Sequence, residues 1–344
     1  MLNEFRQDPI SGRWTLFATG RAKNHLGQKT ESFYKPINEC VFEDLEKASG
    51  DKPLLVFSHG KIIDWNPQSD WTTAVVKNKF PVVNHGVCSE ISNQDFWPRA
   101  NATGYHELVI TRNHDKFFAQ FNDSEMKEVV EAYQERFNII DRDACGDYVL
   151  ILHNHGLSAG ASIYHNHSQI ISLPFVPPGI ASDLARADEY LLKYGVSPFD
   201  VMLEKEMSEA KRVVYQNDNF VVFCPYASRT PYEMRLYSKN KESQFEKLNS
   251  TELEHLAQAL RITFAKLSSA LDDPDYNFYI HASPFTDDGK LISNAYRWHI
   301  EIVPRLSAIA SVELSTGIFV NVVDPDEAAK FLTGSAGSDN VDSV

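Results

Sequence analysis

The sequence predicts an α+β fold made of two similar units, each with an antiparallel sheet and flanking helices. One observation behind this prediction is an internal repeat, and the other is the order of elements within it: strands, one helix, then two more strands. The 344 residues, 43% of them hydrophobic, can bury one large core or two modest ones.

The repeat rests on three matches that occur in the same order in both halves of the chain. GDYVLILHNHG at 146–156 resembles PDYNFYIHASP at 274–284. Upstream, residues 105–137 resemble residues 231–264, and each segment contains a short strand, a loop and an amphipathic helix. Both helices open on Asn-Asp-Ser or Asn-Ser-Thr, which are good N-cap residues. One match could arise by chance, but three in order indicate a duplication.

The third match sets the expected correspondence between the two halves. HNHSQIISLP at 165–174 resembles HIEIVPRL, which pairs His165 with His299 and His167 with Glu301. The extra residues of the second half fall in 285–296, a loop by composition. The predicted organisation is a first unit at 1–173, a second unit at 174–332 after a proline-rich join, and a disordered polar tail at 333–344.

Composition excludes several classes of partner. Lys and Arg number 33 against 47 Asp and Glu, a net charge of −14 without a basic cluster, which argues against nucleic-acid binding. No apolar run reaches the roughly 18 residues of a membrane span, and the N-terminus has no signal-peptide pattern. The four cysteines are far apart, as in a cytoplasmic protein with reduced thiols. Small anionic ligands remain compatible with this composition.

Residues 154–174, NHGLSAGASIYHNHSQIISLP, contain the most informative pattern. His165, His167 and Gln169 occupy alternate positions, so a strand would direct all three to one face. A half-exposed strand that carries polar groups outward is one interpretation, and a functional site is the other.

The alternating His-x-His-x-Gln after AGAS resembles the active-site motif of the galactose-1-phosphate uridylyltransferase family, a branch of the histidine-triad superfamily. Further segments resemble the family in the same order: 6–24, 78–83, 104–110, 297–305 and 312–332. The resemblance therefore covers nearly the whole chain. It implies a duplicated pair of histidine-triad-like units.

The resemblance implies that His167 is a nucleophile that attacks the α-phosphorus of a nucleoside diphosphate sugar. A sugar 1-phosphate leaves, and a second one takes the nucleotide from the histidine. Imidazole suits this role because it is largely neutral near pH 7. In the family, the backbone carbonyl of the first histidine, here His165, holds the other ring nitrogen. Members are commonly dimers, so a homodimer is expected.

Gln169 distinguishes between reaction types. Histidine-triad hydrolases carry a histidine at this position, which can protonate a poor leaving group. Glutamine cannot do this, but it can donate a hydrogen bond to a phosphoryl oxygen. Because a sugar 1-phosphate leaves as a stable anion, the glutamine favours transfer between phosphates.

The resemblance also implies a set of substrate contacts. Arg21 would pair with a phosphate, Asn78 with the nucleotide and Asn154 with the phosphoryl group. Glu313 would contact sugar hydroxyls. The small residues Gly160, Ala161 and Ser162 would bring backbone and hydroxyl donors close to the phosphates. A second family arginine is replaced by Asn24, which weakens one expected phosphate contact.

Metal binding is where this sequence departs most from the family. The Cys-x-x-Cys zinc knuckle is replaced by Cys40 and Glu43, which with His114 and His165 could still hold tetrahedral zinc. The alternative is a site without metal, bridged by hydrogen bonds. The knuckle of the second half is replaced by Ser197 and Asp200. A second metal site of some members is represented by His281, His299 and Glu301, for which a buried polar cluster is the alternative.

Three functions remain open on the sequence. The first is transfer of a nucleoside monophosphate, with UMP expected, from a nucleoside diphosphate sugar to a hexose 1-phosphate. The second is a phosphorylase of the same family, in which inorganic phosphate is the acceptor and the nucleotide is often based on ADP. The third is a non-catalytic nucleotide-sugar sensor, suggested by the altered knuckles. A sensor would not need a nucleophile, so the intact His167 and Gln169 argue against it.

Overall fold

The computed structural model describes residues 3–24, 33–84, 96–140, 147–241, 244–284 and 293–334. Nearly all of the predicted tail and most of the predicted loop at 285–296 lie outside these residues. The strands are β1 (Glu4–Gln7), β2 (Trp14–Phe17), β3 (Leu55–Ser58), β4 (Lys61–Ile62), β5 (Thr73–Lys77), β6 (His106–Thr111), β7 (Tyr148–His155), β8 (His167–Leu173), β9 (Val213–Gln216), β10 (Phe220–Phe223), β11 (Met234–Ser238), β12 (Tyr276–His281), β13 (His299–Pro304) and β14 (Phe319–Asn321). The helices are α1 (Leu45–Ser49), α2 (Asp123–Ile140), α3 (Pro178–Tyr194), α4 (Pro198–Glu209), α5 (Ser250–Leu271), α6 (Ser311–Thr316) and α7 (Pro325–Leu332).

A single eleven-stranded sheet runs through both halves of the chain, in the order β4-β3-β5-β6-β8-β7-β12-β13-β11-β10-β9. Every pairing within it is antiparallel. The order β5-β6-β8-β7 is mirrored by β12-β13-β11-β10, so the two repeats meet at the β7–β12 pair. The predicted α+β class, with antiparallel sheets and a duplicated unit, is confirmed.

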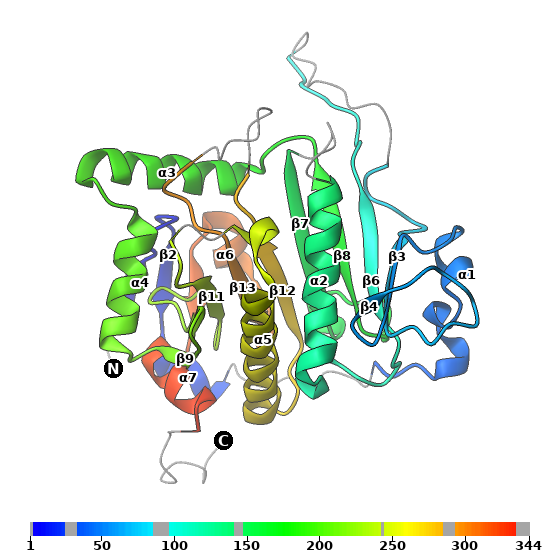
Figure 1. The fold of residues 1–344 in the computed structure, drawn as a ribbon. Helices are drawn as coiled ribbons and strands as arrows, with labels where there is room; N and C mark the ends of the chain where they lie inside the picture. Colours follow the sequence, from blue (N-terminus) through cyan, green and yellow to red (C-terminus); the bar gives the residue numbers. More distant parts are fainter. Residues whose placement is uncertain are drawn as a thin grey trace.

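The two long helices α2 and α5 lie side by side against one face of this sheet (Figure 1). Both follow their N-cap segment at equivalent places in the repeat, and Asn249 caps α5 with a reciprocal bond from Glu252. Their apolar faces and the inward residues of the strands form one core that spans both halves. This layer closes one side of the sheet.

The opposite face is covered by different elements in each half. Helices α3 and α4 pack over β10 and β11 in the second half. In the first half, the segment around Phe42 and Leu45 packs over β5 and β6. Strand β8 lies between these two covers, and Phe42 and Leu108, which lie next to its outer face, line a cavity.

A small three-stranded sheet, β1-β2-β14, joins the two ends of the chain. Strand β14 runs parallel to β2, and the Thr15 hydroxyl donates to the Ala227 carbonyl of the second half. The N-terminal strands therefore lie with the second half in space. The predicted boundary between units at 173 and 174 stays a prediction.

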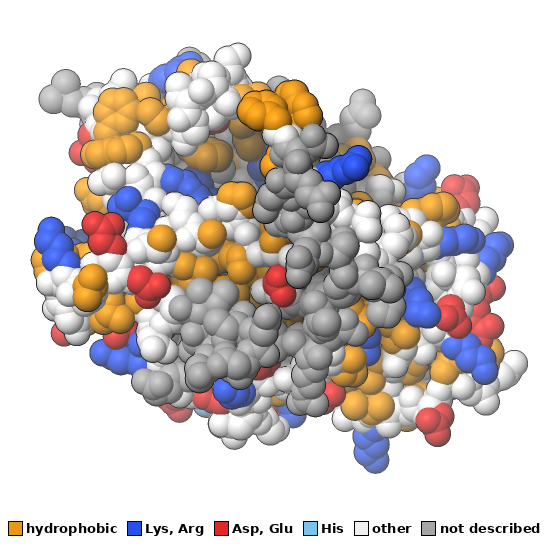
Figure 2. All heavy atoms as spheres, turned by 90° about the horizontal axis from the view of Figure 1, so that it is seen from above, with side chains coloured by type: hydrophobic (Ala, Val, Ile, Leu, Met, Phe, Trp, Pro, Cys, Tyr) orange, Lys and Arg blue, Asp and Glu red, His pale blue; other side chains and the backbone are white. Residues whose placement is uncertain are grey.

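The exposed surface carries mixed charge. On the face seen in Figure 2, basic, acidic and apolar side chains are interspersed over the described residues, without a continuous basic stripe. Among the described residues, no helix is long and apolar enough to cross a membrane.

Candidate active site

The first residues of β8 place the polar motif on the open face of the sheet. Ile170 points into the core beneath α2, so His167 and Gln169 point to the other side, as the alternation predicted. β8 lies between β6 and β7, which fixes its neighbours: Leu108 lies opposite Gln169 on β6, and Leu152 lies opposite it on β7. The interpretation as a half-exposed surface strand is wrong, because His167 is only 8% exposed.

His167 is held in one orientation and one protonation state. Its Nδ1–H donates to the backbone carbonyl of His165 over 2.9 Å, which leaves the lone pair on Nε2. The edge of its ring meets Phe42, with ring centroids 5.1 Å apart. Burial lowers the pKa of His167 to about 4, so the ring is neutral at physiological pH. A neutral imidazole with a free Nε2 lone pair is a competent nucleophile. The expected contact with the His165 carbonyl is confirmed.

Gln169 is oriented by His106, a residue that the sequence analysis did not identify. The Val82 backbone N–H donates to Nδ1 of His106 over 3.0 Å. The remaining ring nitrogen, Nε2, lies 2.9 Å from Oε1 of Gln169. The amide nitrogen of Asn78 also lies 3.0 Å from this Nε2, but both are donors once Nδ1 accepts from Val82, so this approach is a contact and not a hydrogen bond. Asn78, His106 and Gln169 thus form one polar group beside His167.

Asn154 is oriented in a comparable way by Asn277 on β12. The amide nitrogen of Asn277 donates to Oδ1 of Asn154 and to the carbonyl of Ala159, each over 2.8 Å. The Asn154 amide nitrogen has no partner among the described residues, so it can donate to a ligand. Asn277 was also missed by the sequence analysis.

The loop between β7 and β8 turns sharply at Gly156. This glycine has φ +81°, and a Cβ there would lie 1.8 Å from the Asp275 carboxylate. That carboxylate accepts from the backbone N–H and the hydroxyl of Ser158, over 2.7 and 2.5 Å. Residues from the second half therefore hold this first-half loop in place.

The small residues of the loop do not all supply free donors. The N–H groups of Gly160 and Ala161 already bond to carbonyls within the loop, at Leu157 and Gly156. The Ser162 side chain is exposed, and its hydroxyl has no partner among the described residues. Of the three predicted contacts, Ser162 is the one with a donor available.

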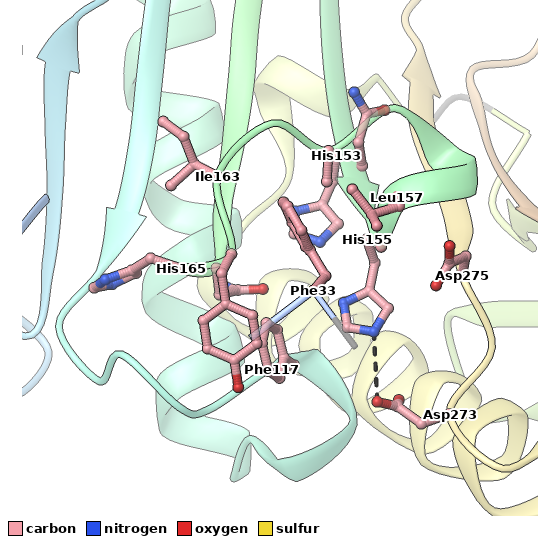
Figure 3. Close-up of a pocket in the computed structure, with 14 residues that line it drawn as sticks. Phe33, Phe117, His153, His155, Leu157, Ile163, His165, Asp273 and Asp275 are labelled. Carbon is pink, nitrogen blue, oxygen red and sulfur yellow. Dashed lines mark ion pairs between the residues drawn. The ribbon is translucent and has the colours of Figure 1, made fainter. Parts of the chain in front are cut away.

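Two cavities flank this loop, and Ile163 lines both of them. The first, of about 340 Å³, lies beside Phe42, Asn78, Phe80 and Leu108. It has apolar walls and an amide at one end, which suits a nucleoside. The second, of about 230 Å³, lies under the loop from Leu157 to His165, where His155 pairs with Asp273 over 3.5 Å (Figure 3).

Arg21 and Glu313 lie elsewhere in this chain. Arg21 is exposed in the 3-10 turn that follows β2, and Glu313 lies in α6 next to β14, so both lie beside the small sheet. Both carboxylate oxygens of Glu313 accept backbone N–H groups, from Ala310 and Val320. Among the described residues, no contact joins either side chain to His167. The structure brings His167, Gln169, Asn78, Asn154 and the loop together, but not these two.

Cys40, Glu43, His114 and His165 converge next to the start of β8, as predicted for a metal site. Nε2 of His165 lies 2.5 Å from the Thr111 carbonyl, and Nε2 of His114 lies 2.7 Å from the Lys35 carbonyl. Each Nε2 therefore carries the proton, and each Nδ1 presents a lone pair.

These lone pairs face one another at short range. Nδ1 of His114 and Nδ1 of His165 are 3.3 Å apart. The Sγ atom of Cys40 lies 3.4 Å from Nδ1 of His165. Oε1 of Glu43 lies 3.6 Å from Nδ1 of His165, and within the described part of the chain this buried oxygen has no hydrogen-bond partner. A thiol proton could satisfy only one of these acceptors, whereas a cation would satisfy all four. The residues fit zinc, which takes four sulfur, nitrogen or oxygen ligands.

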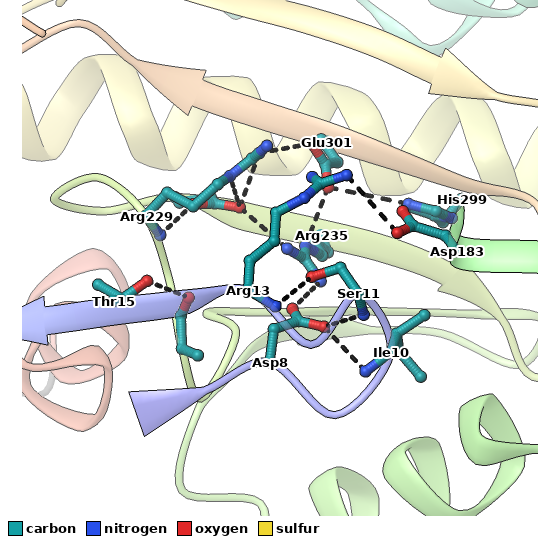
Figure 4. A network of polar contacts seen from close by, with 12 residues as sticks. Asp8, Ile10, Ser11, Arg13, Thr15, Asp183, Arg229, Arg235, His299 and Glu301 are labelled. Atoms are coloured by element: carbon teal, nitrogen blue, oxygen red, sulfur yellow. Dashed lines mark hydrogen bonds and ion pairs between the residues drawn. The ribbon is translucent and has the colours of Figure 1, made fainter. Parts of the chain in front are cut away.

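His281, His299 and Glu301 also lie together, but their surroundings differ (Figure 4). Glu301 accepts from Arg229 over 2.5 Å and lies 3.2 Å from Arg235. Burial alone would raise the pKa of Glu301, but the two guanidinium groups hold it well below its ordinary value. The arginines already balance this carboxylate, so the cluster does not fit a divalent cation. Asp200, which stands at the lost second knuckle, pairs with Arg297 over 2.7 Å.

The sequence of this chain was compared with those of known proteins and protein families. The family model of the galactose-1-phosphate uridyl transferase N-terminal domain matches residues 1–177. The chain belongs to this family. An ADP-glucose phosphorylase of Arabidopsis thaliana is 28% identical over 96% of this chain and 92% of its own length. A galactose-1-phosphate uridylyltransferase of Thermotoga maritima is 28% identical over 68% of this chain and 75% of its own.

A solved structure agrees with the family assignment over the full length. The structure of the Arabidopsis thaliana ADP-glucose phosphorylase with ADP-glucose has a TM-score of 0.78, with 27% identity, and covers 97% of this chain and 98% of that one. The predicted recognition of the family is confirmed, and so is the fold expected for its members.

Proposed function

We propose that this protein is a nucleotidyltransferase that moves a nucleoside monophosphate from a nucleoside diphosphate sugar to a phosphate acceptor. The reaction would pass through a covalent nucleotidyl-histidine at His167. The observation that carries this proposal is the neutral, buried His167 with its Nδ1–H on the His165 carbonyl and its Nε2 lone pair free.

In the first step, the Nε2 lone pair of His167 forms a bond to the α-phosphorus. The bond from that phosphorus to the bridging oxygen breaks, and the sugar 1-phosphate leaves with the electron pair. The positive charge that develops on the ring is stabilised at Nδ1–H by the His165 carbonyl. The amide nitrogens of Gln169 and Asn154 would donate to the phosphoryl oxygens as their charge increases.

In the second step, an oxygen of the acceptor phosphate attacks the same phosphorus. The phosphorus–nitrogen bond breaks, and its electron pair returns to Nε2 of His167. Neither step needs a proton on the leaving group, which suits a site with glutamine rather than histidine at position 169. The nucleoside would occupy the cavity between Phe42, Asn78 and Leu108.

The acceptor and the base divide the proposal into two candidates. Uridylyl transfer from a UDP-sugar to a hexose 1-phosphate is the reaction expected from the family resemblance, although the motif at His167 serves both reactions equally. Phosphorolysis of ADP-glucose is favoured by the ADP-glucose phosphorylase relative, whose match covers nearly both whole chains. A nucleotide-sugar sensor is the remaining candidate and would form no covalent intermediate.

The test is to incubate the protein with UDP-glucose or ADP-glucose, each radiolabelled in the α-phosphate, without an acceptor. Retained label on wild type, but not on His167→Ala, supports the covalent route, and the better donor identifies the base. Release of the label by galactose 1-phosphate or by inorganic phosphate then identifies the acceptor. If both donors bind and neither labels the protein, the sensor is supported instead.

Zinc is proposed as the resident cofactor of Cys40, Glu43, His114 and His165. These residues would hold it between the N-terminal segment and the start of β8, next to the carbonyl that orients His167. Zinc here would stabilise structure, because binding to the folded state alone adds to folding stability.

A homodimer is proposed because the chain lacks two of its expected contacts near His167. A large apolar side chain is exposed at the nucleoside cavity, where Phe80 is 82% exposed. A second copy seated there would supply Arg21 and Glu313. Mixing inactive His167→Ala with inactive Glu313→Ala should then restore part of the activity, whereas sites made within one chain would stay inactive.

A cytoplasmic location is proposed on the free thiols of Cys40 and Cys224.

A further inference from the structure

His106 lies at the start of β6, with its ring between the wall of the nucleoside cavity and Gln169. It is 8% exposed and lines up across the β6–β8 pair with Ile171, two residues beyond Gln169. Three groups meet its two ring nitrogens: the Val82 N–H, the Asn78 amide nitrogen and the Gln169 amide oxygen.

The backbone contact determines where the proton of this ring lies. A backbone N–H can only donate, so Nδ1 of His106 must accept from Val82. The neutral ring then carries its proton on Nε2. That Nε2–H can only donate, so the atom of Gln169 that lies 2.9 Å away must be the carbonyl oxygen.

This assignment decides which end of the Gln169 amide faces the reacting group. A glutamine amide can turn end for end, and only one of the two orientations presents N–H groups to a phosphoryl oxygen. With Oε1 accepting from His106, both hydrogens of the amide nitrogen remain available. Among the described residues, that nitrogen has no partner.

We propose that His106 is a positioning residue for nucleotidyl transfer: it locks the Gln169 amide with its N–H groups toward the phosphoryl group, and it ties this orientation to the cavity wall at residues 78–82. The inference rests on the proposed function and adds a residue to it. The hydrogen bond from Val82 makes this tie; the amide nitrogen of Asn78, whose Oδ1 accepts from the Phe80 N–H over 2.9 Å, only contacts the Nε2–H, since both are donors. His106 therefore links the strand of the catalytic amide to the segment that faces the nucleoside.

Two substitutions of His106 distinguish the role of Nδ1 from the role of Nε2. The amide oxygen of asparagine lies near the place of Nδ1, so His106→Asn keeps an acceptor for Val82 but has no donor that reaches Gln169. The amide nitrogen of glutamine lies near the place of Nε2, so His106→Gln keeps that donor and gives up the acceptor for Val82. Both are polar and uncharged, so they control for each other.

The measurement is the single-turnover rate at which His167 takes up the radiolabelled nucleotide at saturating donor. We expect His106→Asn to lose roughly ten- to a hundredfold in this rate, with KM little changed, because a transition-state donor is misplaced. His106→Gln should keep most of the rate and show a raised KM, because the cavity wall is no longer anchored. Full labelling of His106→Asn at long times would show that its site is folded.

A double-mutant cycle excludes a merely structural role. In a Gln169→Ala background, His106→Asn should cost almost nothing further, because the amide that it orients is gone. An undiminished cost in that background, or equal loss of rate in both His106 variants, would overturn the inference while leaving the labelled wild type and the proposed function intact. A wild type that takes no label would overturn both.

Discussion

The starts of β8 and β13 occupy equivalent places in the two halves, and they have diverged in opposite directions. His167 opens β8 and His299 opens β13, and each donates from Nδ1 to the carbonyl two residues before it. Around His167 the neighbours are neutral, and Phe42, which contacts its ring, lines the nucleoside cavity. Around His299 they are charged: Glu301, Arg235 and Arg229 form a closed network. The same backbone geometry thus supports a nucleophile in one half and a scaffold in the other.

The charged half also has a definite structural role. Arg235 pairs with Asp8 over 2.8 Å, which fastens the N-terminal segment to the second half (Figure 4). Burial alone would raise the pKa of Asp8, but Arg235 and the backbone N–H groups of Ser11 and Ile10 lower it. Buried charges are costly unless every one is paired, so the charges of such a network are engaged with one another. Position within the repeat therefore does not by itself make a histidine catalytic; neutral surroundings next to the wall of a cavity distinguish His167 from His299.

The largest effect is expected when each of the two histidines is removed in turn. His167→Ala should reduce nucleotidyl transfer by roughly three orders of magnitude or more, because the covalent route is lost. His299→Ala should retain transfer, because this ring packs against aromatic neighbours such as Tyr237 and contacts the charged network. Steady-state rates of both variants, with donor binding by calorimetry, provide the check. Equal losses in two well-folded variants would contradict the assignment of the nucleophile.

The second test concerns the charges of the scaffold. Glu301→Gln should lower the free energy of unfolding by about 3 kcal/mol, because Arg229 and Arg235 lose a buried partner. The matched control is Glu254→Gln, which breaks the surface pair with Lys127 and should change stability little. Denaturant unfolding measures both. A neutral effect of Glu301→Gln would mean that the network does not hold the second half together.

The dependence of stability on pH provides a second test of the same ion pairs. Because the pKa of Glu301 is held below its value in the unfolded chain, its contribution is complete above roughly pH 5. It is lost as the pH falls through the lowered pKa of the folded state. Wild type should therefore lose stability more steeply on acidification than Glu301→Gln, and parallel curves would count against this ion-pair account.

How far the sequence carried these conclusions depends on whether a feature is local. The duplication, the antiparallel sheet and the common face of His167 and Gln169 were predicted correctly, since strand alternation and helix caps are local properties. His106 and Asn277 were missed because their roles depend on cross-strand pairing, which only the folded register reveals. The sequence match paired His165 with His299, but the Nδ1 contacts match His167 with His299, a shift of two residues that keeps the same face.

The third test asks whether the first-half cluster differs from the second-half cluster in holding a metal. Chelation should lower the free energy of unfolding by about 2 kcal/mol, the value for a ligand at roughly thirty times its Kd, and should slow transfer. Added zinc should restore both, and Cys40→Ser should weaken zinc binding. Elemental analysis and thermal unfolding measure this. Protein that is free of metal when gently purified, and indifferent to chelators, would make the cluster a hydrogen-bonded one like its counterpart around Glu301.

The smallest expected effect concerns position 169, where the active half has glutamine and the scaffold has glutamate. Gln169→His should still form nucleotidyl-His167 but lose it to water roughly tenfold faster, because an imidazole can take a proton from an attacking water. Nε2–H of His106 would hold one nitrogen of the new ring and leave the other toward the site. Gln169→Leu is the control, since it removes the amide without adding a titratable group. The decay of isolated labelled protein in buffer gives the rate. If both variants decay at the wild-type rate, the glutamine is not what protects the intermediate, and exclusion of water by the neighbouring loop from Gly156 to Ser162 would have to do so.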